Sequence, residues 1–97
     1  MPRRSELDVL HAMLYSISQG YSSKSSLMKN AGLGAKQLQE YLEYTFKKDI
    51  VDEKDGRLVL TEKGRKVLEE LEKISELQAE IAMRLSVLQE IIEGEEN

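Results

Sequence analysis

The chain has 97 residues, a formal net charge of −4, a single histidine and no cysteine. This composition excludes a disulfide framework, a cysteine-ligated zinc and a histidine cluster for a metal, and the length fits one small domain with at most an appendage. Because the sequence contains no apolar run of about 18 residues and no apolar signal segment after Met1, we expect a cytoplasmic protein without a membrane span.

Three short helices are predicted in the first half of the chain. Apolar residues at helical spacing predict the first helix over 5–19. Ser22 or Ser23 then caps a second helix that leads to the tight turn Gly32-Leu33-Gly34, and a third helix follows over 35–48. The third helix has one apolar face, made of Leu38, Tyr41, Leu42 and Phe46. Two short helices joined by a few residues with glycine form the helix-turn-helix pattern.

A β-hairpin and a long helix are predicted next. Two short apolar runs flank Asp55-Gly56, which is the strongest short-range signal for a hairpin. Thr61 stands where the N-cap of a helix belongs, and nothing ends the helical pattern before Gly94. This order predicts a mainly α fold with a small β-hairpin. Its predicted parts are a winged helix-turn-helix domain over 1–62, a long C-terminal dimerisation helix over 63–93, and a frayed acidic tail over 94–97.

The predicted long helix carries an apolar stripe that repeats in heptads. Its two rows are Val67, Ile74, Ile81 and Leu88, and Leu71, Gln78, Leu85 and Ile92. Such a stripe is unstable in water, and the N-terminal unit is too short to cover all of it. We therefore predict a homodimer joined through this helix as a coiled coil. Gln78, the polar member, either fixes the register or lies partly exposed where the stripe widens. The stripe itself leaves parallel and antiparallel pairing open.

Charge is divided unevenly along the chain. Residues 1–66 contain twelve Lys or Arg and nine Asp or Glu, a balance of +3, whereas residues 67–97 contain two and nine, a balance of −7. The first two-thirds of the chain can therefore face a polyanion, while the last third would be repelled by one.

The third helix is the first candidate for DNA contact, because in this architecture its N-terminal residues enter the major groove. Lysine and glutamine there can reach guanine, adenine or phosphate. Its candidate residues are Ala35, Lys36, Gln37 and Gln39. Gln37 is predicted either to read a base or to bond within the turn, and the alternative for the whole set is an ordinary solvated helix face.

Two other segments offer contacts to the DNA backbone. Hydroxyl groups and lysines at the start of the second helix suit phosphate oxygens. These candidates are Ser23, Lys24, Ser25 and Lys29. At the hairpin tip Lys54 and Arg57 face each other. A wing commonly touches the DNA backbone or the minor groove, so Arg57 is the better candidate, although the nearby carboxylates weaken the wing electrostatically. Arg3 and Arg4 form either an N-terminal arm or a disordered start.

A set of short motifs resembles one known family. The motifs are Leu27-Met28-Lys29-Asn30-Ala31-Gly32-Leu33, Gln37-Leu38, Tyr41-Leu42, Ile50-Val51 and Leu60-Thr61-Glu62-Lys63-Gly64. In this order and spacing, over roughly residues 7–75, they resemble the small archaeal winged-helix DNA-binding proteins of the ten-kilodalton crenarchaeal type. The resemblance implies a dimer joined by an antiparallel coiled coil of the last helix, with one winged domain at each end.

The chain departs from this family's pattern in identifiable places. Thr45 stands where an apolar residue is usual, and we expect Phe46 to supply the bulk instead. Asp49 stands where glycine usually ends the third helix, so a left-handed backbone is expected at an aspartate. The acidic C-terminal third favours a specific regulator over an abundant chromatin-packing protein.

We therefore predict sequence-selective binding of double-stranded DNA as a homodimer, with a role in transcription regulation. The alternatives are a winged-helix module for protein–protein assembly that does not bind DNA, and an architectural chromatin protein. No nucleophile, base and orienting group can be named, so no enzyme, cofactor or small-molecule ligand is predicted. His11 is expected at the edge of the first helix's apolar stripe, not at a metal.

Overall fold

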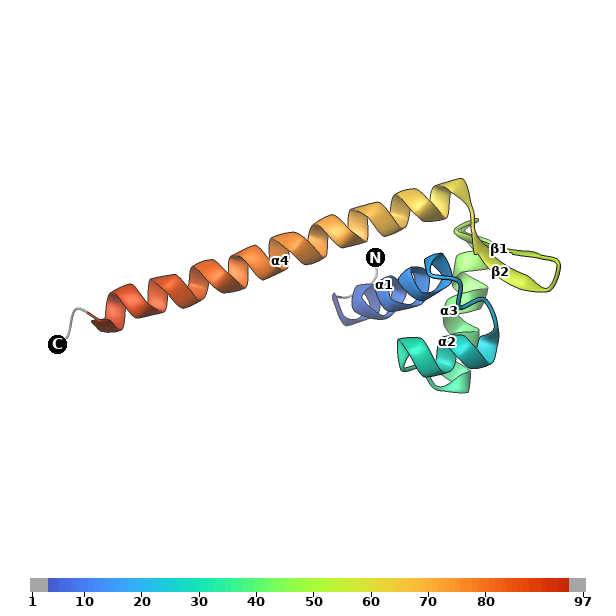
Figure 1. The fold of residues 1–97 in the computed structure, drawn as a ribbon, viewed down its shortest axis with the longest axis horizontal. Coiled ribbons are helices and arrows are strands. Elements are labelled where there is room, and N and C mark those ends of the chain that lie inside the picture. Colours follow the sequence, from blue (N-terminus) through green and yellow to red (C-terminus); the bar gives the residue numbers. More distant parts are fainter. Residues whose placement is uncertain (1–3, 95–97) are drawn as a thin grey trace.

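The computed structural model describes residues 4–94, with side chains from Glu6 onward. Three short helices, a two-stranded antiparallel hairpin and one long helix follow each other, as predicted. Their bounds are α1 (Arg4–Ser18), α2 (Lys24–Ala31), α3 (Ala35–Lys47), β1 (Val51–Lys54), β2 (Arg57–Leu60) and α4 (Glu62–Gly94). The predicted N-terminal arm and the acidic tail beyond Gly94 lie outside the described residues and side chains. Figure 1 shows a small unit of α1, α2, α3 and the hairpin, from which α4 projects.

The hydrophobic core lies between α1, the helix-turn-helix pair, the hairpin and the first turns of α4. It consists of Leu10, Met13, Leu14, Ile17, Leu27, Leu33, Leu38, Leu42, Ile50, Val51, Leu58, Leu68 and Leu71. Side chains three and four residues apart on α1 face this core, as the helical spacing of the sequence predicts. His11 is half-buried at the edge of this face, which confirms the boundary position expected for it.

The end of α3 corrects one expectation about its apolar face. Thr45 is fully buried, whereas Phe46 is 42% exposed, so Phe46 does not replace the missing apolar residue. The Thr45 hydroxyl lies 2.9 Å from the carbonyl oxygen of Tyr41 and 3.0 Å from that of Leu42, and its one proton is shared between these two acceptors. Threonine is therefore tolerated in the core because its polar group bonds to its own helix.

Left-handed backbone appears at the predicted turns. Asp49, which follows α3, has φ = 61°, as expected for the position where glycine is usual. At the hairpin tip Asp55 and Gly56 have φ values of 53° and 75°, and two successive positive values characterise the type I′ turn that joins twisted strands. The register pairs Val51 with Leu60 and Lys54 with Arg57, which confirms that Lys54 and Arg57 face each other.

The start of α4 is capped as predicted. The Thr61 hydroxyl accepts a hydrogen bond of 2.9 Å from the backbone N–H of Gly64. The same hydroxyl lies 2.6 Å from the carbonyl oxygen of Asp49, to which it donates. Lys63 donates from Nζ to the carbonyl oxygen of Lys48 at 2.7 Å. The first turn of α4 is thereby attached to the end of α3.

The apolar stripe of α4 is divided between two environments. Leu68 and Leu71 are buried in the core of their own chain, and Val67 packs against that core. Beyond Leu71 no residue of α4 is buried, up to the end of the described helix at Gly94. The exposed apolar side chains that continue the stripe are Ile74, Leu77, Ile81, Leu85, Leu88 and Ile92. The first heptad of the predicted dimerisation seam therefore serves the monomer's own core.

Candidate nucleic-acid interface

The start of α2 settles which serine caps the helix. Ser23 has extended backbone, and its Oγ accepts a hydrogen bond of 3.2 Å from the N–H of Ser26. In return Ser26 Oγ accepts one of 3.2 Å from the N–H of Ser23, which completes a capping box. The Ser23 hydroxyl is thus engaged in the cap, while Lys24 and Ser25 beside it are exposed.

The wing is tied to the start of α2 by a backbone hydrogen bond. The N–H of Leu58 in β2 donates to the carbonyl oxygen of Ser22 at 3.0 Å. A shallow depression lies between the two segments, lined by Ser22, Ser23, Lys24, Ser25, Glu53, Gly56 and Leu58. Ser23, Lys24 and Ser25, the predicted phosphate contacts at the start of α2, therefore lie next to the hairpin. One carboxylate, that of Glu53, lies beside them.

The N-terminal turn of α3 presents its predicted contact residues to solvent. Ala35, Lys36, Gln37 and Gln39 are exposed, whereas Leu38 between them is buried. The N-cap residue, Gly34, offers no side-chain hydrogen bond to the first N–H groups of the helix. Backbone donors at such a helix start are available to an anion.

Two features reduce the positive character of this helix. Gln39 donates from its amide to the carboxylate of Glu43 at 3.1 Å, and Glu40 is exposed one position after Gln39. The Gln37 side chain makes no hydrogen bond within the described part of the chain, so the structure does not show the bond within the turn that was one of its two predicted roles. Of the four predicted residues on α3, Lys36 is the one with a free positive charge.

The structure brings together two arginines that belong to different predicted elements, the hairpin and the long helix. Arg57 of β2 and Arg65 of α4 line one depression with Ile17 and Ser18 at the end of α1 and Gly20 just beyond it. Sequence reasoning missed Arg65, because it was assigned to the long helix and no local signal places that turn beside the hairpin. Lys54, on the other strand, does not line this depression.

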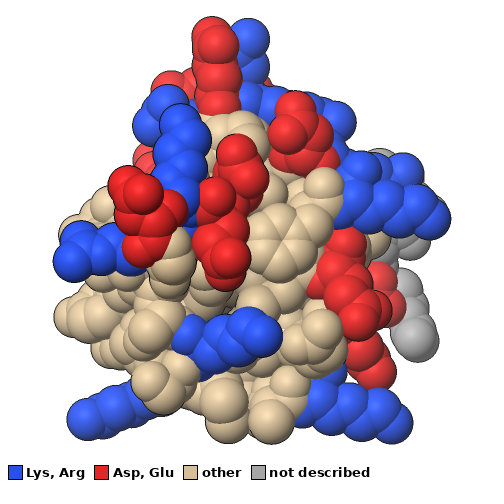
Figure 2. Space-filling view, turned by 90° about the vertical axis from the view of Figure 1, so that its right-hand side faces the viewer, with Lys and Arg blue, Asp and Glu red and all other residues tan. Residues whose placement is uncertain are grey.

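Charges of both signs cover the end of the molecule that carries the hairpin. Figure 2 shows acidic and basic side chains mixed over the upper and right-hand parts of this face, whereas the basic side chains in its lower part are separated by uncharged surface and form no continuous positive patch. The wing contributes to this mixture because Asp52, Glu53 and Asp55 are exposed next to Lys54 and Arg57. Attraction to a polyanion must therefore come from individually placed lysines and arginines.

A second depression lies between α1 and α3 on a different part of the domain. It is lined by Glu6, Leu10, Glu40, Tyr41 and Tyr44. Burial raises the pKa of the Tyr41 hydroxyl above its usual range, and the carboxylates of Glu6 and Glu40 raise it further. Tyr41, from the predicted apolar face of the third helix, is half-buried, and Tyr44 is 40% exposed.

Neither a group of metal ligands nor a membrane-spanning helix is found among the described residues. No three His, Cys, Asp or Glu side chains between residues 4 and 94 are grouped so that they could hold a metal ion. None of the helices in that range is long and apolar enough to cross a membrane.

Comparison with known proteins identifies the fold. A profile described as winged helix-turn-helix matches residues 3–79, whereas a comparison with curated protein sequences finds no match. Among solved structures, the chain is similar to Sso10a-2, a DNA-binding protein from Sulfolobus solfataricus. The TM-score is 0.77 and the sequence identity 16%, and the likeness covers 91% of this chain and 96% of that chain. It confirms the expected resemblance to small archaeal winged-helix proteins at the level of the fold. Because the profile covers most of the chain, the protein belongs to the winged helix-turn-helix family.

Proposed function

We propose that this protein binds double-stranded DNA, as a homodimer and with sequence selectivity, and that it regulates transcription. The observation that carries the proposal is the gathering of the candidate contacts at one end of the molecule. The start of α2, the exposed first turn of α3 and the hairpin all lie at the end opposite the free end of α4 (Figure 1). The similar Sulfolobus structure, itself that of a DNA-binding protein, supports the same function.

Within this interface we assign different tasks to different residues. Lys36, at the outer face of the first turn of α3, would contact base edges or phosphate in the major groove. Lys24, Ser25 and Lys29 would contact phosphates at α2. Arg57, with Arg65 beside it, would contact the backbone next to the wing. Ser23 would contribute through its capped helix start, since its hydroxyl is already engaged.

The homodimer is supported by the exposed part of the α4 stripe. Its apolar side chains are between 39% exposed, at Ile74, and 59% exposed, at Ile81 and Ile92. From Ile74 to Ile92 the stripe extends for about 27 Å, at a helical rise of about 1.5 Å per residue. An apolar surface of this length on one helix is characteristic of a helix that pairs with another.

Charge on α4 favours antiparallel pairing, the orientation that the family resemblance also implies. Glu80 and Arg84 lie on the same flank of the stripe, and Arg84 is the one basic residue between Ile74 and Ile92. In an antiparallel pair the flank that carries Glu80 and Arg84 faces the same flank of the partner's helix. Glu80 would therefore lie near Arg84 of the partner subunit. In a parallel pair the opposite flank, with Ser75, Ala82 and Gln89, would face Arg84 and offer it no carboxylate.

A role in protein–protein assembly without DNA is the second candidate function. The carboxylates of Glu40 and Glu43 on the outward side of α3 favour it, because they interrupt the positive charge between Lys36 and Lys47. This alternative gives the same dimer but no salt-dependent affinity for DNA.

A binding experiment across salt concentrations separates the two functions. The wild-type protein is titrated onto a random-sequence duplex and onto duplexes enriched by repeated selection, between about 50 and 200 mM salt. We expect steep loss of affinity with salt and a defined sequence among the selected duplexes. Lys36→Ala and Arg57→Ala should each weaken binding. Each lost phosphate contact should also lower the salt slope by about 0.9, or by about 1.8 in a dimer.

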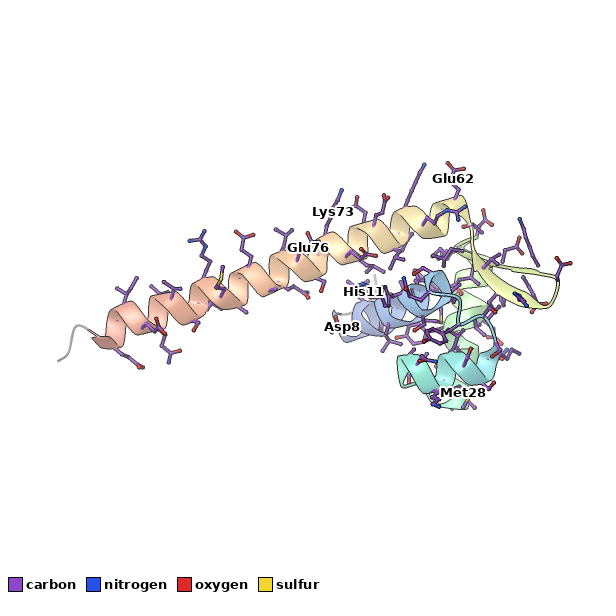
Figure 3. All side chains as sticks on the ribbon, in the orientation of Figure 1. Asp8, His11, Met28, Glu62, Lys73 and Glu76 are labelled. Carbon is purple, nitrogen blue, oxygen red and sulfur yellow. The ribbon has the colours of Figure 1, made fainter. Side chains whose placement is uncertain are left out.

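Lys73→Ala is the matched control. Its side chain points away from α1 on the outer side of α4 (Figure 3), and its ammonium lies 3.8 Å from the carboxylate of Glu70. Removing this charge should leave DNA affinity unchanged. If wild-type protein fails to bind any duplex even near 50 mM salt, DNA binding is excluded and assembly becomes the better explanation.

A further inference from the structure

An apolar groove separates α1 from the first half of α4. Its walls are formed by Leu7 and Leu10 of α1 and by Val67, Leu71 and Ile74 of α4, and its outer rim by Lys63, Lys66 and Glu70. Leu10 and Leu71 are buried at the bottom of the groove, whereas Leu7 and Val67 are half-buried and Ile74 is 39% exposed. The described residues place nothing over these apolar side chains.

The groove lies on the same side of α4 as the exposed stripe. Successive residues of a helix are rotated by about 100°, so Ile74, Ile81, Leu88 and Ile92 fall close to one line along α4. Continued toward the start of the helix, that line passes between Val67 and Glu70, which both border the groove. Leu71 lies about a quarter of a turn from this line and Leu68 roughly three-eighths of a turn, and α4 buries both residues in the core of its own chain. A helix placed along the stripe would therefore run directly into the groove.

The spacing of the stripe indicates which part of a partner helix would arrive there. Ile74 and Leu88 are each seven residues from Ile81, and Leu77 and Leu85 are each four residues from it. An antiparallel pair centred on Ile81 therefore places every one of these apolar residues opposite another. In that register Ile92 of the partner subunit falls opposite Glu70, which precedes Ile74 in the sequence and borders the groove.

We propose that the last turns of the partner subunit's α4, with Leu88 and Ile92, occupy the groove between α1 and α4. The proposal rests on the proposed homodimer and specifies a contact beyond the helix pair itself. The winged domain's apolar surface is then complete only in the dimer, because Leu7, Val67 and Ile74 become covered by a second copy.

One consequence concerns the geometry of DNA binding. A helix pair joined only along its stripe can bend at the point where α4 leaves the domain. With the partner's helix end held between α1 and α4, each winged domain is attached to both long helices. The α3 helices of the two subunits are then fixed relative to each other, as is required of a dimer that binds two half-sites on one DNA duplex.

Cysteine cross-linking tests the contact directly, because the chain has no cysteine of its own. Three variants are oxidised mildly and separated on non-reducing gels. Ile81→Cys reports the centre of the helix pair. The double variant Leu7→Cys/Ile92→Cys reports the groove, and Leu7→Cys/Val87→Cys is the matched control, since Val87 is exposed on another side of α4. We expect covalent dimers from the first two variants and only background from the control.

The outcomes distinguish this inference from the dimer on which it rests. If Ile81→Cys cross-links but Leu7→Cys/Ile92→Cys does no better than the control, the dimer stands and the groove contact is wrong. If Ile81→Cys fails to cross-link and sedimentation shows a monomer, the homodimer is wrong and the groove contact with it.

A second measurement protects the test against a folding defect at Leu7. Ile92→Glu changes a side chain that is 59% exposed in the single chain, yet it should accelerate amide hydrogen exchange in α1. Val87→Glu, the control on another side of the helix, should leave exchange in α1 as in the wild type. Equal exchange in α1 for both variants and the wild type would overturn the proposal.

Discussion

The backbone of Gly64, in the first turns of α4, lies directly against the carbonyl group of Ile50 at the start of the hairpin. A Cβ atom at residue 64 would collide with the Ile50 carbonyl oxygen and would come within 3.0 Å of its carbonyl carbon. The same oxygen accepts a hydrogen bond of 3.1 Å from the N–H of Thr61, and the Thr61 hydroxyl, which donates to Asp49, also lies 3.1 Å from it. The segment Thr61-Glu62-Lys63-Gly64 is therefore a joint in which cap, lysine and glycine together hold α4 against the end of α3 and the hairpin.

Replacing Gly64 by alanine should destabilise the domain. Alanine in a helix is ordinarily about 0.5–1 kcal/mol better than glycine, but here the collision with backbone forces the helix away from the hairpin, at a cost of about 1–3 kcal/mol. Chemical denaturation measures the difference. Gly94→Ala is the control, because a Cβ there meets nothing within 4 Å, and it should be neutral or slightly stabilising. A Gly64→Ala variant as stable as the wild type would show that this close approach is not required.

Replacing Asp49 by glycine should stabilise the protein. The left-handed backbone at Asp49 (φ = 61°) costs an ordinary residue about 1–2 kcal/mol, while glycine adopts it freely and loses part of that gain to its greater freedom in the unfolded chain. We expect a net gain of about 0.5–1 kcal/mol in the free energy of unfolding. Asp49→Ala removes the same carboxylate without easing the backbone, so it should show no such gain. Equal effects of the two variants would assign the change to the side chain.

Replacing Thr45 by valine should leave stability nearly unchanged or raise it. Valine has the same shape, and the buried hydroxyl that it removes serves carbonyl oxygens of α3, at Tyr41 and Leu42. Tyr41 and Leu42 lie within α3, where their carbonyl oxygens accept helical N–H bonds, so removing the hydroxyl leaves no buried polar group unpaired and avoids the usual penalty. Thr45→Ala, by contrast, leaves a cavity in a side-chain position that is 0% exposed and should cost about 1–2 kcal/mol. Thermal unfolding of the three proteins measures both effects, and a large loss with valine would contradict this account.

The stability of the protein should fall in alkali partly through Tyr41. Burial first, and then the carboxylates of Glu6 and Glu40, raise the pKa of Tyr41 above its ordinary value of 10.0. The folded protein therefore holds this proton more tightly than the unfolded chain does. The resulting stabilisation is complete below about pH 10 and is lost as the pH rises through the raised pKa. Tyr41→Phe should lose less stability than the wild type above about pH 10, measured as denaturation midpoints, whereas parallel curves would show that Tyr41 does not contribute.

The elements of the fold could be predicted from the sequence because their signals are local. Asp55-Gly56 supplies the two positive φ values of the hairpin turn, and Thr61 supplies the cap of α4 through a hydroxyl three residues from its N–H partner. The helical spacing of apolar residues sets the inward face of α1. These are properties of neighbouring residues, so they hold before any distant contact is made.

The spatial arrangement of the candidate DNA contacts could not be predicted from such local signals. Ser22 and Ser23 are both suitable N-caps for α2, and in the structure Ser23 is the cap. The carbonyl oxygen of Ser22 instead accepts a hydrogen bond from the N–H of Leu58 in the wing. Arg65 joins Arg57 only because the first turn of α4 is attached to the end of α3. Each of these outcomes depends on segments far apart in the chain.

The sequence by itself determined the kind and order of every helix and strand, the type of hairpin turn and the existence of a long apolar stripe on α4. Only the tertiary structure decided how the stripe is used. Because α1 packs against one side of the first turns, Leu68 and Leu71 enter the core of their own chain, and the stripe from Ile74 onward stays exposed. Likewise, the packing of α3 buries Thr45 and leaves Phe46 outside. Helical periodicity tells which residues share a face, but the face that is covered depends on contacts between helices that only the folded chain brings together.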